Sequence, residues 1–89
     1  MRKRSRGAIE GIVQGVGFRP FIYQLALRNG LSGYVINTSR GVDLEVEGTE
    51  EGIEDFYRSV MSEGPPLALI SSMARTELPV RHDNGFEIR

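Results

Sequence analysis

The sequence has 89 residues, which is enough for one domain with a single hydrophobic core. It contains no cysteine and one histidine, so a disulfide scaffold, a thiolate metal site, a cysteine nucleophile and a histidine-rich metal site are all excluded. The formal net charge is -1 at pH 7, which argues against a general nucleic-acid binder, because such proteins usually carry a basic excess.

Basic residues dominate the start of the chain. The segment Arg2 to Arg6 holds four positive charges, and no apolar stretch of a secretory signal follows it. No apolar run is long enough to span a membrane, so we expect a cytoplasmic protein. Because chain termini are commonly solvated, residues 1–5 are predicted to form a flexible tail of a single domain over residues 1–89.

A strand, a loop and a helix are predicted next. Residues 6–13 alternate as a strand does, with Ile9 and Val13 on one face. Residues 14–19 contain two glycines and indicate a loop, after which Pro20 suits the first turn of a helix. The helix is predicted from an apolar stripe, and Asn29-Gly30 is its stop signal; the stripe comprises Phe21, Ile22, Leu25 and Ala26.

Residues 34–46 predict a β-hairpin. Its first strand is rich in aromatic and β-branched residues, and residues 38–41 (Thr-Ser-Arg-Gly) have the composition of a turn. The second strand shows the clearest alternation in the chain, because apolar and acidic residues take turns along it. The apolar set is Val42, Leu44 and Val46, and the acidic set is Asp43, Glu45 and Glu47.

Acidic residues are concentrated between Asp43 and Glu63, where eight of them stand against Arg58 alone. We expect this stretch to present a solvated face, directed away from any anion site. Thr49 is the predicted N-cap of a second helix, which Gly64 with Pro65-Pro66 ends. Its apolar stripe is predicted from the helical spacing of Ile53, Phe56, Tyr57, Val60 and Met61.

The last third of the sequence predicts two more strands. Residues 67–78 indicate a fourth strand, with a bulge or a register change because Ile70 and Met73 are three residues apart. Residues 86–88 can add a short last strand, and His82 in the polar stretch before it is expected to be solvated. The order β-α-β-β-α-β predicts an α+β fold, the ferredoxin-like sandwich, with an antiparallel sheet and two helices on one face.

The loop of residues 14–19 is the first candidate site. It connects a strand to a helix start, where backbone N–H groups lack partners and the helix dipole is positive. Gly15 and Gly17 permit the curled backbone of an anion nest, and the Arg19 guanidinium matches the oxygens of a phosphate. Sequence patterns of other phosphate loops are absent, and the competing interpretation is a plain turn before a helix.

Asn37 is the second candidate. It ends a predicted strand, and its amide can donate and accept hydrogen bonds, so it could hold a water and a substrate oxygen together. The competing interpretation is that Asn37 merely begins the turn at Thr38. No metal site is predicted, and no cofactor.

Two segments resemble a known family. Residues 11–19 (Gly-Ile-Val-Gln-Gly-Val-Gly-Phe-Arg) resemble the signature of the acylphosphatases, and residues 33–37 (Gly-Tyr-Val-Ile-Asn) resemble a second signature of that family. The resemblance covers nearly the whole chain. It implies that Arg19 binds phosphate with the loop amides and that Asn37 orients the attacking water. The implied phosphate-binding residues are Gln14, Gly15, Val16, Gly17, Phe18 and Arg19.

A narrower resemblance concerns a domain found in larger proteins. Residues 18–23, 41–48 and 65–68 (the last being Pro-Pro-Leu-Ala) are similar to the N-terminal acylphosphatase-like domain of the carbamoyltransferases that mature [NiFe]-hydrogenase. This implies binding and hydrolysis of carbamoyl phosphate, with the remaining domains of a carbamoyltransferase as possible partners. The chain would then be an excised domain or a short relative of one, and monomeric by itself.

Three other functions stay open. One is a free-standing acylphosphatase that hydrolyses acyl phosphates in general. A second is a module that binds carbamoyl phosphate without hydrolysing it, since the same groups bind ground and transition states. A third is RNA binding, which some ferredoxin-like domains perform, but the acidic residues of the predicted third strand would repel RNA.

Overall fold

The computed structural model describes residues 1–64 and 68–89. Its elements, in chain order, are β1 (Arg2–Ile12), α1 (Phe18–Arg28), β2 (Ser32–Asn37), β3 (Gly41–Thr49), α2 (Glu50–Glu63), β4 (Leu69–Leu78) and β5 (Phe86–Ile88). The predicted β-α-β-β-α-β order is confirmed, and the short last strand is present as β5. The Pro65-Pro66 helix stop and the predicted start of the fourth strand at Leu67 lie outside the described residues.

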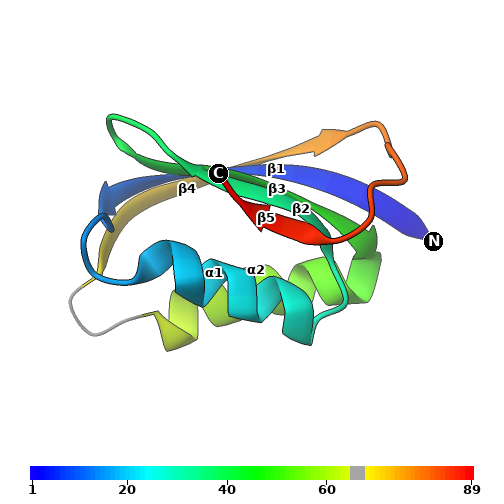
Figure 1. The fold of residues 1–89 in the computed structure, drawn as a ribbon, viewed down its shortest axis with the longest axis horizontal. Coiled ribbons are helices and arrows are strands. Elements are labelled where there is room, and N and C mark those ends of the chain that lie inside the picture. The colour runs from blue at the N-terminus through cyan, green and yellow to red at the C-terminus, as the bar shows by residue number, and fades with distance from the viewer. Residues whose placement is uncertain (65–67) are drawn as a thin grey trace.

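The five strands form one sheet in the order β4-β1-β3-β2-β5. The four longer strands pair antiparallel, whereas β5 pairs parallel with β2, so the sheet is mixed. The register of β1 against β4 shifts between Glu10 and Gly11, which confirms the bulge or register change predicted there. Figure 1 shows both helices on one face of the sheet.

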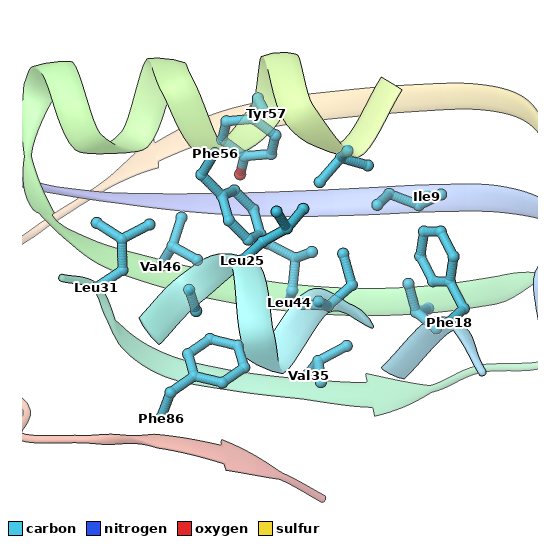
Figure 2. Close-up of a cluster of buried hydrophobic side chains, with 14 of the residues drawn as sticks. Ile9, Phe18, Leu25, Leu31, Val35, Leu44, Val46, Phe56, Tyr57 and Phe86 are labelled. Carbon is cyan, nitrogen blue, oxygen red and sulfur yellow. The ribbon is translucent and has the colours of Figure 1, made fainter. Parts of the chain in front are cut away.

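The helices pack on the sheet largely through the predicted apolar stripes. In α1 the predicted Phe21 is only partly buried, whereas Phe18, predicted in the loop, is fully buried. Helix α1 buries Phe18, Ile22, Leu25 and Ala26, while α2 buries Ile53, Phe56, Tyr57 and Val60. Met61 was predicted in the stripe of α2, but it is 57% exposed and lies outside the core. Side chains from both helices and from β1, β2, β3 and β5 meet in this cluster, as Figure 2 shows.

The start of α2 and the end of α1 lie where the sequence predicts, whereas α1 begins at Phe18, two residues before the predicted Pro20. Thr49 Oγ1 accepts a hydrogen bond of 3.0 Å from the Gly52 N–H, so Thr49 caps α2. Asn29 is the C-cap of α1, and Gly30 follows it with a φ of 67°. The Leu31 N–H then donates to the Ala26 carbonyl over 2.9 Å, which satisfies an end carbonyl of α1 and turns the chain into β2.

The first residues are part of β1, so the predicted flexible tail is wrong. Arg4 is 1% exposed. Its guanidinium contacts the Glu47 carboxylate at 3.0 Å and the Glu45 carboxylate at 2.7 Å. Arg2 pairs with Glu47 at 2.6 Å. The physical reason is strand pairing, because β1 and β3 place alternate basic and acidic side chains opposite each other on the face that the helices leave open.

The acidic face of β3 is accordingly not solvated along its whole length. Glu47 is fully buried, because the segment between β4 and β5 runs from one sheet edge to the other across this face. The backbone N–H groups of Arg81 and His82 each donate to the Glu47 carboxylate over 2.8 Å, and Asp83 pairs with Arg4 at 3.0 Å. The His82 side chain is exposed, as predicted.

Candidate functional site

The loop after β1 and the turn between β2 and β3 lie at the same end of the molecule, at the left in Figure 1. A small open pocket of about 160 Å³ lies there. It is lined by Val13, Gln14, Gly15, Gly17, Phe18, Arg19, Pro20 and Asn37. The structure thus brings together the two segments that the sequence singled out separately. The lining contains one cation, Arg19, and no acidic side chain.

The backbone at the start of α1 supplies hydrogen-bond donors to this pocket region. Gly15 and Gly17 have φ values of 75° and 78°, so the loop curls through the left-handed region twice. Gly17 is the N-cap of α1, and no side chain caps the helix there. The first turn of α1 lies within the described residues and contains no acidic residue. Its leading N–H groups are therefore available to an anion at the positive end of the helix dipole.

Pro20 occupies the first turn of α1, where its missing N–H leaves no helix hydrogen bond unmade. The loop predicted for residues 14–19 is shorter in the structure, because Phe18 and Arg19 already belong to the helix. The ring of Phe18 is buried in the core at 1% exposure, and it anchors the helix start against the sheet. The N–H groups of Phe18 and Arg19 are consequently held on a rigid element.

The Arg19 guanidinium is partly ordered by the end of β5. Its Nη1 donates a hydrogen bond of 3.1 Å to the Arg89 carbonyl, and the Arg89 N–H donates to the Val35 carbonyl over 2.8 Å. The other N–H groups of the guanidinium make no hydrogen bond within the described residues, so they can donate to an oxyanion. Sequence reasoning did not identify the contact with Arg89, because the parallel pairing of β5 that creates it leaves no local signal.

Asn37 ends β2, and its exposed side chain lines the same pocket as Arg19. Within residues 1–64 and 68–89 its amide makes no hydrogen bond, so it can donate to or accept from a water molecule. Thr38 begins the following turn, where its Oγ1 accepts from the Gly41 N–H over 3.1 Å. The turn predicted at residues 38–41 is therefore confirmed.

Gln14 connects the two segments. Its side-chain Nε2 donates to the Thr38 carbonyl and, over 3.1 Å, to the Gly41 carbonyl. The sequence placed Gln14 among the phosphate-binding residues but gave no signal for this contact, because Gln14 and Gly41 are 27 positions apart.

In the part of the chain that the structure describes, no cluster of three or more His, Asp or Glu side chains could hold a metal ion. No helix among the described residues is long and apolar enough to cross a membrane.

Comparison with known proteins assigns the family. Residues 5–88 match the acylphosphatase family model. The chain is 40% identical to an acylphosphatase of Bacillus pumilus over 91% of each sequence. It is 45% identical over 97% of its length to the carbamoyltransferase HypF of Rhizobium leguminosarum bv. viciae, of which it spans 11%.

Solved structures agree with these sequence relatives. A full-length HypF in its phosphate- and nucleotide-bound form matches the whole chain with a TM-score of 0.97 and 39% identity, and the chain covers 12% of it. An acylphosphatase from Coxiella burnetii matches with a TM-score of 0.92 and 30% identity over 99% of this chain and 93% of that one. The chain spans about a tenth of the HypF relatives and about nine tenths of the acylphosphatases, and it belongs to the acylphosphatase family.

Proposed function

We propose that this chain hydrolyses acyl phosphates, carbamoyl phosphate among them, at the pocket between the loop after β1 and the turn after β2. One observation carries the proposal: the uncapped start of α1, Arg19 and Asn37 line one small pocket that contains no acidic side chain. An oxyanion with a water beside it is the ligand that this set of donors favours.

The loop amides and Arg19 would hold the phosphoryl group. The phosphate-binding set proposed is Gln14, Gly15, Val16, Gly17, Phe18 and Arg19, with the backbone N–H groups and the guanidinium as donors. As the P–O bond to the acyl group lengthens, charge spreads over the equatorial oxygens, where these donors stabilise it. Arg19 is the proposed catalytic residue for this charge stabilisation.

Asn37 would place the nucleophile. Its amide holds a water molecule in line with the breaking bond, which is a positioning effect and not base catalysis. The water oxygen forms the new P–O bond, and the carboxylate or carbamate leaves with the electron pair of the old one. Both protons of the water stay on the phosphate, which is formed as dihydrogen phosphate and then exchanges protons with solvent. A strong base is unnecessary, because the leaving group is already a stable anion.

A second candidate function is binding of carbamoyl phosphate without hydrolysis, as one part of a larger carbamoyltransferase. The similarity to HypF over the whole of this chain and only about a tenth of that protein favours it. The remaining domains of such a protein would then be the partners, and carbamoyl phosphate would be the ligand of the same pocket.

We further propose a monomer in the cytoplasm that binds a small molecule and not nucleic acid. The absence of cysteine supports the cytoplasm, because small secreted domains are commonly stabilised by disulfides. The basic residues of β1 argue against nucleic-acid binding, because Arg2, Arg4 and Arg6 each pair with a carboxylate on β3.

The test is hydrolysis of benzoyl phosphate and carbamoyl phosphate by the purified chain, with inorganic phosphate as inhibitor. We expect turnover of both substrates, a loss of both turnover and phosphate inhibition in Arg19→Ala, and a loss of turnover alone in Asn37→Ala. Arg40→Ala is the matched control, because that side chain is 78% exposed near the same end and lies outside the pocket. Phosphate binding without turnover in the parent chain would reject hydrolysis in favour of the binding module.

A further inference from the structure

The side chain of Gln14 lies between the two halves of the proposed site and makes two hydrogen bonds there. Its Nε2 carries two N–H groups, and they are donated to the carbonyls of Thr38 and Gly41. Both acceptors belong to the turn that follows Asn37. The donors of the Gln14 amide are therefore already used, and they are unavailable to a phosphate in the pocket.

The turn that receives these hydrogen bonds is a closed unit. The Thr38 N–H donates to the Gly41 carbonyl over 2.9 Å, and Thr38 Oγ1 accepts from the backbone N–H groups of Arg40 and Gly41. Asn37, directly before it, is fixed on its other side by pairing with Val42. A group that holds the turn therefore also fixes the backbone from which the Asn37 amide projects.

The loop has no backbone pairing to this turn at the level of Gln14. The pairing of β1 with β3 ends at Glu10 opposite Gly41, and the Gly11 N–H donates to the Arg40 carbonyl over 3.0 Å. Ile12 still pairs with β4, and beyond it the chain leaves the sheet and curls through Gly15 and Gly17. Among the described residues, the Gln14 side chain supplies the hydrogen bonds that continue this junction into the anion-binding loop.

We propose that Gln14 is a positioning residue, and that its side chain fixes the distance between the loop amides and Asn37. This rests on the proposed function, because the distance matters when a water on Asn37 must attack a phosphorus held by the loop. A misplacement of about 1 Å between reacting groups lowers a rate by about 100-fold. The side chain of Gln14 is thereby assigned to the geometry of attack, and only its backbone N–H can serve the phosphate.

The experiment compares Gln14→Met and Gln14→Glu with the parent chain. Methionine keeps the length of the side chain without its donors, and glutamate replaces the donors with an acceptor that faces two carbonyls. We expect kcat for benzoyl phosphate to fall about 10- to 100-fold in both variants. Inhibition by inorganic phosphate should stay close to that of the parent in Gln14→Met, whereas the carboxylate of Gln14→Glu, which would line the pocket, should also weaken it by charge repulsion. Gln24→Met is the matched control, because Gln24 is exposed on α1 away from the pocket, and its kcat should equal that of the parent.

A double-mutant cycle separates positioning from a merely structural role. If Gln14 acts through Asn37, Gln14→Met should cost little further in an Asn37→Ala background. Equal losses of kcat in both backgrounds would overturn the proposal, as would an unchanged kcat in both Gln14 variants. Weakened phosphate inhibition with an intact kcat would also overturn it, because the side chain would then be a ligand.

A readout without turnover keeps the two proposals distinguishable. If the parent chain is inactive, the proposed hydrolysis fails, and a phosphate titration followed by NMR decides the role of Gln14. The expected result is that the backbone amide signals of residues 15–19 shift while the side-chain amide signals of Gln14 stay in place. Side-chain signals that shift with the backbone signals would show Gln14 binding the anion, which would overturn the inference.

Discussion

Arg19 differs from a lysine at the same place in the shape of its charged group. The planar guanidinium presents several N–H donors in a fixed arrangement, so one can contact the Arg89 carbonyl while others address a phosphate. A lysine ammonium would keep the charge, but it could not hold one donor on the Arg89 carbonyl and present a pair of parallel donors to a phosphate.

Arg19→Lys should therefore bind phosphate more weakly and lose roughly 2–4 kcal/mol of transition-state stabilisation, about the effect of removing one oxyanion donor. The measurement is kcat/KM for benzoyl phosphate, together with the inhibition constant of inorganic phosphate. A lysine variant with the kcat/KM of the parent would show that charge alone suffices and that the guanidinium geometry is irrelevant.

Glu47 is a fully buried carboxylate whose ionisation is coupled to the stability of the fold. Burial by itself would raise the pKa of Glu47, but hydrogen bonds from the Arg81 N–H, from Arg2 and Arg4 and from the His82 N–H lower it from 4.5 to about 2. The folded state thus holds the carboxylate ionised at acidities where the unfolded chain takes up a proton. The stability that it contributes is complete above its ordinary range and is lost as the pH falls from about 4.5 towards about 2.

Glu47→Gln should lower the free energy of unfolding by about 1–3 kcal/mol near neutral pH, because it removes the ionised acceptor shared by Arg2, Arg4 and two backbone N–H groups, while Arg4 keeps its contacts with Glu45 and Asp83. Thermal unfolding followed between about pH 6 and about pH 3 should show a flatter pH dependence in the variant than in the parent. Asp55→Asn is the control, since the Asp55–Arg58 pair is exposed and should be worth about 0–1 kcal/mol. Equal effects of the two substitutions would contradict the role assigned to Glu47.

At the scale of elements, the start of α1 must both turn through a left-handed backbone conformation and present N–H groups to the proposed anion site. Gly17 has a left-handed backbone, yet a Cβ there would meet no atom within 4 Å, so the requirement for glycine is conformational and not steric. Gly30, after the other end of α1, has the same properties and lies outside the pocket. The two glycines form a matched pair for separating stability from anion binding.

Gly17→Ala and Gly30→Ala should each destabilise the fold by about 1–2 kcal/mol, the cost of a left-handed backbone for a residue with a Cβ. Only Gly17→Ala should also weaken binding of inorganic phosphate, because relief of the strain would turn loop N–H groups away from the pocket. Thermal unfolding with and without phosphate measures both effects. Similar phosphate affinities in the two variants would argue against the loop as the anion site.

The elements themselves could be predicted largely from the sequence, because their signals are local. The cap at Thr49, the stop at Asn29-Gly30 and the alternation of β3 each depend on neighbouring residues, and the structure confirms them. The N-terminal strand could not be predicted in this way. Its basic residues resemble a solvated tail until they are set against the acids of β3, more than 30 positions away.

A signal for that pairing was nevertheless present. Arg2, Arg4 and Arg6 have the same period of two as Asp43, Glu45 and Glu47, which is the pattern of two antiparallel strands with opposite charges on one face. The prediction that Met61 is buried was wrong for a different reason, because its local signal was present but ambiguous. Its spacing places it on the edge of the apolar stripe of α2, and only the packing of that helix decides whether an edge position is covered.

For the whole molecule, the topology explains why 89 residues suffice for a site. The antiparallel pairing of β1, β3 and β2 brings the loop after β1 and the turn after β2 to one end of the sheet. The segment between β4 and β5 crosses the open face, buries Glu47 and leads to β5, whose end contacts Arg19. The residue types of the site follow from the sequence, whereas the contacts that join them follow from this topology.

Hydrolysis of benzoyl phosphate by the parent chain, Arg19→Ala and Asn37→Ala, measured beside inhibition by inorganic phosphate, tests the proposed site most directly. We expect turnover in the parent that both substitutions abolish or strongly reduce, with phosphate inhibition retained in Asn37→Ala and lost in Arg19→Ala if this is the site. Turnover unchanged by either substitution, or phosphate inhibition unaffected by the loss of Arg19, would contradict the proposed site.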